Sequence, residues 1–258
     1  MNRCFTMTQE IISVPPTSGF DIVLVQGPFD AGLVGLAKES VSLWDAEELA
    51  GLRALLGASH AVSTRWSWLA ENFNYMNDAD ADILIASGVY NPLLKDPASA
   101  VQAHSEGKEV FLADGIVRDL RERARTDPVE ARASGVYRLQ RKDVQSKVPV
   151  TELDSYGPTR FLFGDQAKPY GAFLEAAGIT SVPFYVVNAD HARKQESPFA
   201  RAFAVSNLLY RSRLSGLNSG LHYDIGRVGG VRPYAREAGA PKSSTGNEGS
   251  PLELKLAH

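Results

Sequence analysis

FARAFAVSNLLYRSRLSGLNSGLHYDIGRVGGVRPYAR, residues 199–236, is the stretch of this sequence that says most about its fold. The 258-residue chain contains 37 Lys, Glu, Gln, Met and Trp residues, so about five are expected in a stretch of this length, yet none occurs there. Segment 199–236 instead sets Tyr, Ser, Asn, Gly, Arg and His on a frame of Leu, Val and Ala. That composition is close to the composition of an antibody paratope, and it indicates a contact surface.

The missing residue types also have a genetic interpretation. Random replacement of the adenines in an AAY codon for Asn reaches fifteen amino acids, and Lys, Glu, Gln, Met and Trp are the five that it cannot reach. Every residue of segment 199–236 belongs to the reachable set. The alternative interpretation is a polar, glycine-rich loop region that lacks these five types by chance.

On these residues the chain resembles the variable proteins of diversity-generating retroelements. The stretch Gly229-Gly230-Val231-Arg232-Pro233 is similar to the strand that closes their domains. The resemblance covers only the C-terminal sixth of the chain. It implies a C-type-lectin-like or formylglycine-generating-enzyme-like scaffold that presents a hypervariable ligand-binding face. The Trp-rich glycine motifs usual in that scaffold are not found here.

The spacing within segment 199–236 separates scaffold residues from surface residues. A regular series of aliphatic side chains is predicted to point inward: Leu208, Leu214, Leu217, Leu221, Val228 and Val231. The residues between them are predicted to face outward and to bind the ligand: Ser206, Asn207, Tyr210, Arg211, Arg213, Asn218, His222, Tyr223, Asp224 and Arg227. Tyr and Arg dominate interface energetics, so two residues of each type, Tyr210, Tyr223, Arg211 and Arg213, are the first candidates for strong contacts. The competing interpretation is that Arg211, Arg213 and Arg227 pair with acids of the same domain.

Composition limits the other classes of function. The net charge is -3, which argues against a general nucleic-acid partner. The lone cysteine, Cys4, excludes an intrachain disulfide and a thiolate metal cluster. Formylglycine-generating enzymes use late cysteines that this chain lacks, so we expect binding without catalysis and without a cofactor. The sequence contains no run of 18 apolar residues, so no membrane span is expected. No signal peptide is expected either. A cytoplasmic location is then the default, with delivery to a phage particle or a cell surface as the alternative.

The remainder of the chain predicts mixed helices and short strands. Residues 20–26 (FDIVLVQ) are expected to form a buried strand, and Asp45 is expected to cap a helix that ends at Gly57. Residues 179–187 predict another strand, in which Pro183 indicates an edge or a bulge. The predicted fold class is therefore α+β, and the resemblance implies that its C-terminal part is loop-rich and C-type-lectin-like. We expect one domain over residues 1–237 and a disordered tail over 238–258.

Two other functions stay open at this stage. The glycines at 27, 32 and 35 follow the first strand, so an α/β enzyme could bind a phosphate-bearing ligand there, although the spacing matches no nucleotide motif. A turn with close helix packing explains such glycines more often. The chain could also be a phage or prophage structural protein. The ligand of the preferred function, a protein or a glycan, is not specified by the sequence.

Overall fold

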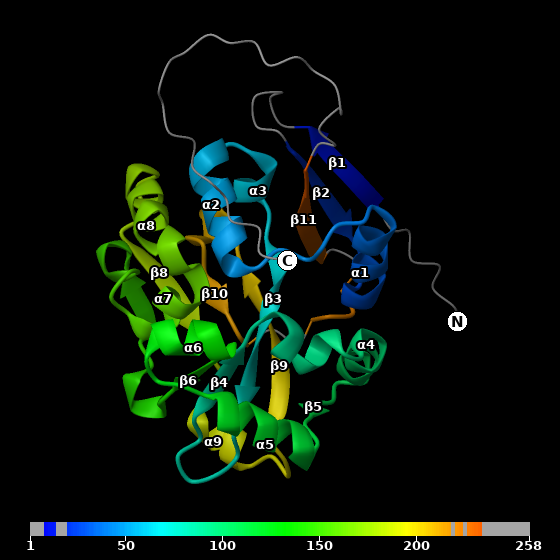
Figure 1. The fold of residues 1–258 in the computed structure, drawn as a ribbon, viewed down its shortest axis with the longest axis vertical. Helices are drawn as coiled ribbons and strands as arrows, with labels where there is room; N and C mark the ends of the chain where they lie inside the picture. The colour runs from blue at the N-terminus through cyan, green and yellow to red at the C-terminus, as the bar shows by residue number, and fades with distance from the viewer. Residues whose placement is uncertain (1–7, 14–19, 218–219, 224–225, 234–258) are drawn as a thin grey trace.

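The computed structural model describes residues 8–13, 20–217, 220–223 and 226–233, which form two β-sheets with helices packed around them (Figure 1). The smaller sheet has the order β1-β2-β11 and the larger follows the path β6-β4-β3-β9-β10-β8-β7, with β5 paired to β9. The strands are β1 (Thr8–Ser13), β2 (Phe20–Gln26), β3 (Ser67–Tyr75), β4 (Ile83–Ala86), β5 (Val110–Phe111), β6 (Val136–Leu139), β7 (Lys147–Pro149), β8 (Ser181–Tyr185), β9 (Phe199–Val205), β10 (Leu214–Ser215) and β11 (Arg227–Pro233).

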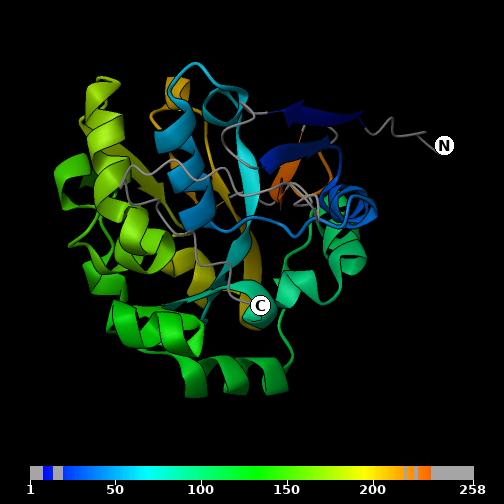
Figure 2. The ribbon, with the colours of Figure 1, turned by 45° about the horizontal axis from the view of Figure 1, so that its top comes forward.

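The helices divide between the two sides of the larger sheet. In Figures 1 and 2, α6, α7 and α8 gather at one side, and α1 and α4 lie at the other beside the smaller sheet. The helices are α1 (Phe29–Lys38), α2 (Ala46–Leu56), α3 (Ala61–Thr64), α4 (Pro97–Ser105), α5 (Asp114–Arg123), α6 (Pro128–Ser134), α7 (Gly157–Phe163), α8 (Ala167–Ala176) and α9 (Ala189–Arg193). None of the described helices is long and apolar enough to cross a membrane.

The smaller sheet joins the two ends of the described chain. β2 is the predicted buried strand, and it pairs antiparallel with β1 on one side and with β11 on the other. Residues 22–25 are all at most 2 % exposed, as expected for a β-branched run between two neighbours. The predicted closing strand is confirmed as β11, and residues 227–233 of segment 199–236 therefore lie against the N-terminal part of the fold.

Two glycines of β11 are required by close packing. A Cβ added to Gly229 would lie 2.4 Å from Cζ2 of Trp44, and one added to Gly230 would lie 2.1 Å from the carbonyl oxygen of Ser42. The Trp44 N–H also donates to the Gly229 carbonyl over 2.9 Å. The chain before α2 thus rests directly on the backbone of β11.

β3 is the centre of the larger sheet, and all nine of its residues are buried. It pairs antiparallel with β9, and the register shifts between Trp68 and Asn72. Its aromatic side chains pack in the core: Phe73 packs against Phe184 and Phe203, with ring centres 5.9 and 5.2 Å apart. β9, the first strand of segment 199–236, is thereby fixed to the core.

Local signals identified several elements correctly. Asp45 caps α2 by accepting from Glu48 N–H, and Gly57 is the C-cap. The predicted strand is present over residues 181–185 as β8, which lies between β7 and β10 and so is not an edge strand over its whole length, although at Pro183 it pairs with β7 alone. β10 pairs only with Phe184 and Tyr185, so no hydrogen bond between β8 and β10 needs the N–H that Pro183 lacks. The predicted tail, residues 238–258, lies outside the described residues, and the one-domain boundary stays a prediction.

Candidate ligand-binding face

Segment 199–236 runs through both sheets and over the surface between them. It begins as β9, continues as the loop of residues 206–213 (loop 206–213), returns as β10, crosses to α1 and closes as β11 (Figure 1). The crossing includes residues 218–219 and 224–225, which are not described. The exposed parts of this path are the candidate ligand-binding face.

Loop 206–213 is closed by its own backbone. The Ser206 N–H donates to the Arg213 carbonyl over 2.9 Å, and the Ser212 N–H donates to the Asn207 carbonyl over 3.1 Å. The Asn207 side chain accepts from the Tyr210 N–H and so caps the short turn Leu208–Tyr210. Arg211 and Ser212 have φ angles of 56° and 51°, a left-handed conformation that reverses the chain. The tip residues Leu209 and Tyr210 are left 86 % and 65 % exposed.

A buried arginine from α2 forms hydrogen bonds with both ends of this loop. Arg53 is completely buried, and its Nη1 donates to the Ser206 carbonyl over 2.9 Å and to Ser212 Oγ over 2.8 Å. The Tyr170 hydroxyl lies 3.1 Å from the same Nη1 and 2.6 Å from Ser212 Oγ. Carbonyl groups of Val62 and Arg65 accept the remaining Arg53 hydrogen bonds. No carboxylate of the described residues pairs with Arg53, so neutral acceptors alone solvate a buried charge, and its loss is expected to be costly.

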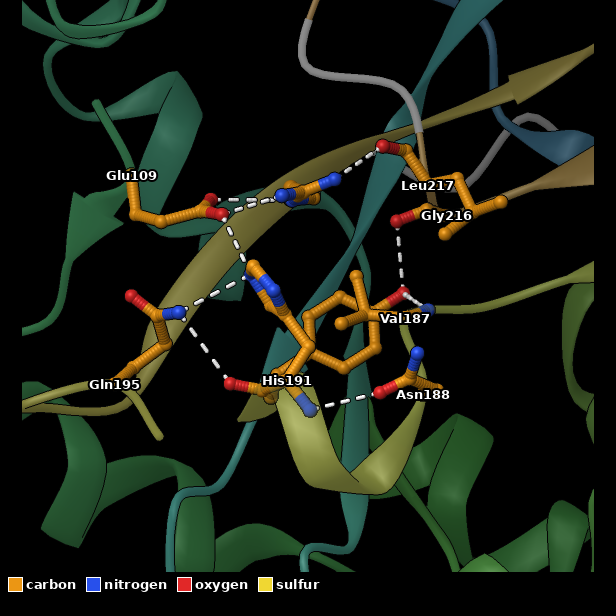
Figure 3. Close-up of polar contacts among 9 residues, drawn as sticks. Glu109, Val187, Asn188, His191, Gln195, Gly216 and Leu217 are labelled. Carbon is orange, nitrogen blue, oxygen red and sulfur yellow. Dashed lines mark hydrogen bonds and ion pairs between the residues drawn. The ribbon is translucent and has the colours of Figure 1, made fainter. Parts of the chain in front are cut away.

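A second anchor holds residues 216 and 217 (Figure 3). The Tyr75 hydroxyl donates to the Gly216 carbonyl over 2.7 Å, and Arg201 Nη1 donates to the Leu217 carbonyl over 2.5 Å. Burial raises the pKa of Tyr75, so the hydroxyl keeps its proton and remains a donor. The anchor therefore acts on backbone carbonyl groups, which every residue type provides.

The Arg201 side chain is oriented by Glu109, which sits between α4 and β5. Glu109 Oε1 forms an ion pair with Arg201 Nη2, and Oε2 accepts from Arg201 Nε over 3.1 Å. His191 Nε2 lies 3.2 Å from Glu109 Oε1, and Gln195 donates to the His191 carbonyl (Figure 3). Burial alone would raise the pKa of Glu109, but the hydrogen bond and charge of Arg201 hold it below its usual range. Glu109 is therefore ionised at neutral pH and fixes the arginine in place.

A third set of anchors comes from the backbone of the N-terminal part. The Phe29 N–H donates to the Leu221 carbonyl and the Gly27 N–H donates to the Gly226 carbonyl, both over 2.9 Å. Together with the Trp44–Gly229 bond, these contacts hold residues 221, 226 and 229 without using a side chain of segment 199–236.

The structure sorts the predicted binding residues into three groups. Tyr210, Arg211, Arg213 and Tyr223 are exposed, while Asn207, His222 and Arg227 are half-buried. Ser206 is only 7 % exposed, so its predicted outward orientation is wrong; the end of β9 and the Arg53 bond hold it in the interior. Asn218 and Asp224 lie outside the described residues. The assignment of these residues to ligand binding stays a prediction.

The predicted inward residues are mostly confirmed. Leu214, Leu221 and Val228 are fully buried, and Leu208 and Val231 are half-buried. Leu217 is 39 % exposed, so its inward orientation is wrong; it follows the last paired residue of β10, where the alternation of the strand no longer applies.

The arginines of the face are not neutralised within the described structure. Arg211 and Arg213 form no ion pair with any described residue, which argues against their predicted alternative role in internal pairs. Arg213 instead lies over the Tyr185 ring, with 5.5 Å between the guanidinium carbon and the ring centre. Arg227 donates to the Gln26 side-chain oxygen over 2.7 Å. Tyr185 belongs to β8 and was missed in the sequence because it lies outside segment 199–236.

The glycines after β2 have a packing role. A Cβ on Gly32 would lie 2.7 Å from Val228 Cγ2, and one on Gly35 would lie 2.7 Å from Val25 Cγ1, so α1 needs both glycines to approach the smaller sheet. At the start of α1, the Ala31 N–H donates to the Asp30 carboxylate, a negative charge where a phosphate would have to sit. These contacts account for Gly32 and Gly35 by packing. No group of three metal-ligating side chains is arranged around a metal site among the described residues.

Comparison with known proteins supports the fold assignment. No family model matches the chain, and no curated protein matches it. A solved structure described as "Accommodation of massive sequence variation in Nanoarchaeota by the C-type lectin fold" superposes with a TM-score of 0.57 and 12 % sequence identity. The match covers 83 % of this chain and 97 % of that one. The chain is thus an α+β protein with the C-type lectin fold.

Proposed function

We propose that this chain is a variable protein of a diversity-generating retroelement, which binds a ligand through segment 199–236 and catalyses no reaction. The observation that carries the proposal is that residues outside segment 199–236 hold much of its backbone, while the exposed side chains at the tip of loop 206–213 hold none of it. Donors outside it hold the carbonyls of residues 206, 216, 221, 226 and 229. The side chains at the tip of loop 206–213 contribute to none of these bonds, so they can change without altering the path of the chain.

Two further observations support the proposal. The five residue types that adenine replacement in Asn codons cannot produce are absent from the segment. The protein that shares this fold is itself described as accommodating massive sequence variation. We place the ligand of this chain in the broad class of proteins and glycans.

The direct test is to sequence the DNA that flanks the gene. The proposal expects a near-copy of the codons for residues 199–236 beside a reverse transcriptase gene, with differences confined to adenines of the copy. It also expects sibling genes to differ at exposed positions such as Tyr210 and Arg213, and to agree at buried positions such as Leu214. Absence of such a copy, or differences spread over all four bases, would reject the proposal.

A further inference from the structure

Five exposed residues lie at the turn between β9 and β10 or, through the contact of Arg213 with Tyr185, beside it, and we call them the arginine–tyrosine patch: Tyr185, Leu209, Tyr210, Arg211 and Arg213. Four of them come from loop 206–213. Tyr185 comes from β8, and its carbonyl accepts from the Gly216 N–H over 2.9 Å. Tyr185 is 40 % exposed, and the Arg213 guanidinium lies over its ring. Residues near and far in sequence thus share one surface.

The patch carries positive charge that the described structure does not compensate. Several arginines elsewhere in the fold are paired with carboxylates, such as Arg132 with Glu47, Arg138 with Asp82 and Arg201 with Glu109. Arg211 and Arg213 have no such carboxylate among the described residues, although the chain as a whole has a net charge of -3. Within the described residues the charge at the patch is therefore not compensated, and it is complementary to an acidic partner.

The patch is also held in one conformation before it binds anything. The Asn207 cap, the left-handed turn at Arg211 and Ser212, and the Arg53 bonds to both ends of the loop fix the backbone. The ring of Tyr185 restricts the Arg213 side chain. A surface that is ordered in advance loses less conformational entropy on binding.

We propose that the arginine–tyrosine patch binds an acidic segment of a partner protein, with carboxylates at Arg211 and Arg213 and an apolar side chain against Leu209 and Tyr210. Leu209 offers a sugar no hydrogen-bonding side chain, which favours a peptide over a glycan. The inference rests on the proposed binding function and specifies the chemistry of its ligand. It adds Tyr185 as a contact that retroelement diversification of segment 199–236 would not change.

The test uses the full chain and a fluorescent peptide with phenylalanine between two runs of three glutamates. A peptide with lysines in place of the glutamates is the charge control. Fluorescence anisotropy at low salt is expected to detect binding of the acidic peptide only. The double variant Arg211→Ala/Arg213→Ala is expected to weaken this binding roughly tenfold, and Tyr185→Ala roughly threefold, since interface Arg and Tyr residues typically contribute such amounts.

The matched control is Arg118→Ala/Arg160→Ala, which removes the same charge from two exposed arginines outside the patch. It is expected to change the affinity less than twofold. Equal losses in the two double variants, or no binding of the acidic peptide, would overturn the inference, provided that circular dichroism shows each variant to be folded. The flanking DNA separates this inference from the proposed function. A templated copy with no patch-dependent binding rejects only the acidic ligand, whereas patch-dependent binding without a copy rejects only the retroelement origin.

Discussion

Arg53 Nη1 donates a hydrogen bond of 2.8 Å to Ser212 Oγ and thereby ties α2 to the far end of loop 206–213. The same nitrogen holds the Ser206 carbonyl at the near end, so one buried guanidinium closes the base of the loop. A cation without a described carboxylate partner is rare in a protein interior, because its desolvation must be offset by neutral acceptors alone. The base of loop 206–213 thus depends on one buried side chain from outside segment 199–236.

Replacement of Arg53 by methionine is expected to destabilise the fold strongly. The change leaves the Ser206 carbonyl, the Tyr170 hydroxyl and the other acceptors without their donor, and each such loss costs about 1–3 kcal/mol. We expect the free energy of unfolding in urea to fall by at least about 3 kcal/mol. Arg160→Met, which alters an exposed arginine, is the control and is expected to stay within about 0.5 kcal/mol. Equal stability of the two variants would mean that Arg53 does not support the loop.

Gly230→Ala is expected to damage the junction between β11 and the chain before α2. The new Cβ would meet the Ser42 carbonyl oxygen at 2.1 Å, and a backbone atom cannot move aside as a flexible side chain could. Overpacking of this kind costs about 1–3 kcal/mol or more. Gly115→Ala in α5 is the matched control, since nothing lies within 4 Å of its added Cβ. Thermal melting should show a lower Tm for Gly230→Ala and no loss for Gly115→Ala; a similar Tm for both would contradict the packing described here.

The sequence predicted those parts of the fold that local signals determine. The capping residue Asp45 and the strand 20–26 depend on neighbours in the chain, and both were correctly placed. The composition of segment 199–236 indicated the C-type lectin fold through a resemblance. Arg53 could not be recognised as a buried anchor, because its partners at Tyr170, Ser206 and Ser212 are distant in sequence.

The candidate site was predicted in outline but not in its details. The alternation between polar and aliphatic residues correctly predicted which side chains are exposed at four positions: Tyr210, Arg211, Arg213 and Tyr223. The errors at Ser206 and Leu217 arise where β9 and β10 end and the alternation stops. Tyr185 was missed because it enters the surface through strand pairing with residue 215, a contact that no local pattern encodes.

The acidic residues around the start of α2 are expected to make the protein more stable in mild acid. Burial is the main cause that raises the pKa of Glu48 to about 7 and the pKa of Glu71 well above its usual range, and the charge of Asp45 adds to both. The folded state then binds more protons than the unfolded state, in which a Glu titrates near 4.5. The stabilisation from Glu48 is complete below pH 4.5 and is lost as the pH rises to 7, and that from Glu71 is lost at higher pH.

Glu71→Gln tests this dependence while keeping an oxygen that can accept from the Ala46 N–H. The variant should gain stability at pH 8 relative to the natural protein and should show a weaker decrease in stability between pH 5 and pH 8. Urea unfolding across this range measures both effects. An unchanged pH profile would show that Glu71 has an ordinary pKa.

His104 is expected to act in the opposite direction. It is 4 % exposed on α4; burial lowers its pKa to about 4, and the charge of Arg201 contributes further. The unfolded state binds a proton near pH 6.5, so the contribution of His104 is complete above that pH and is lost as the pH falls to about 4. His104→Leu should remove this acid sensitivity. His60→Leu, at a less buried histidine, is the control, and equal changes in both acid profiles would contradict the assignment.

The tip of loop 206–213 is expected to tolerate simultaneous replacement. Tyr210, Arg211 and Arg213 are exposed, and the described bonds that hold their positions use backbone groups or the side chains of Asn207, Ser212 and Arg53. Changing all three to alanine should alter the free energy of unfolding by less than about 1 kcal/mol, as is usual for surface substitutions. Ser212→Ala removes the hydroxyl that bonds Arg53 and Tyr170, and it should cost more than the triple change although it alters one residue. If urea unfolding gives the reverse order, the tip side chains stabilise the fold, and this loop could not vary freely on a constant backbone.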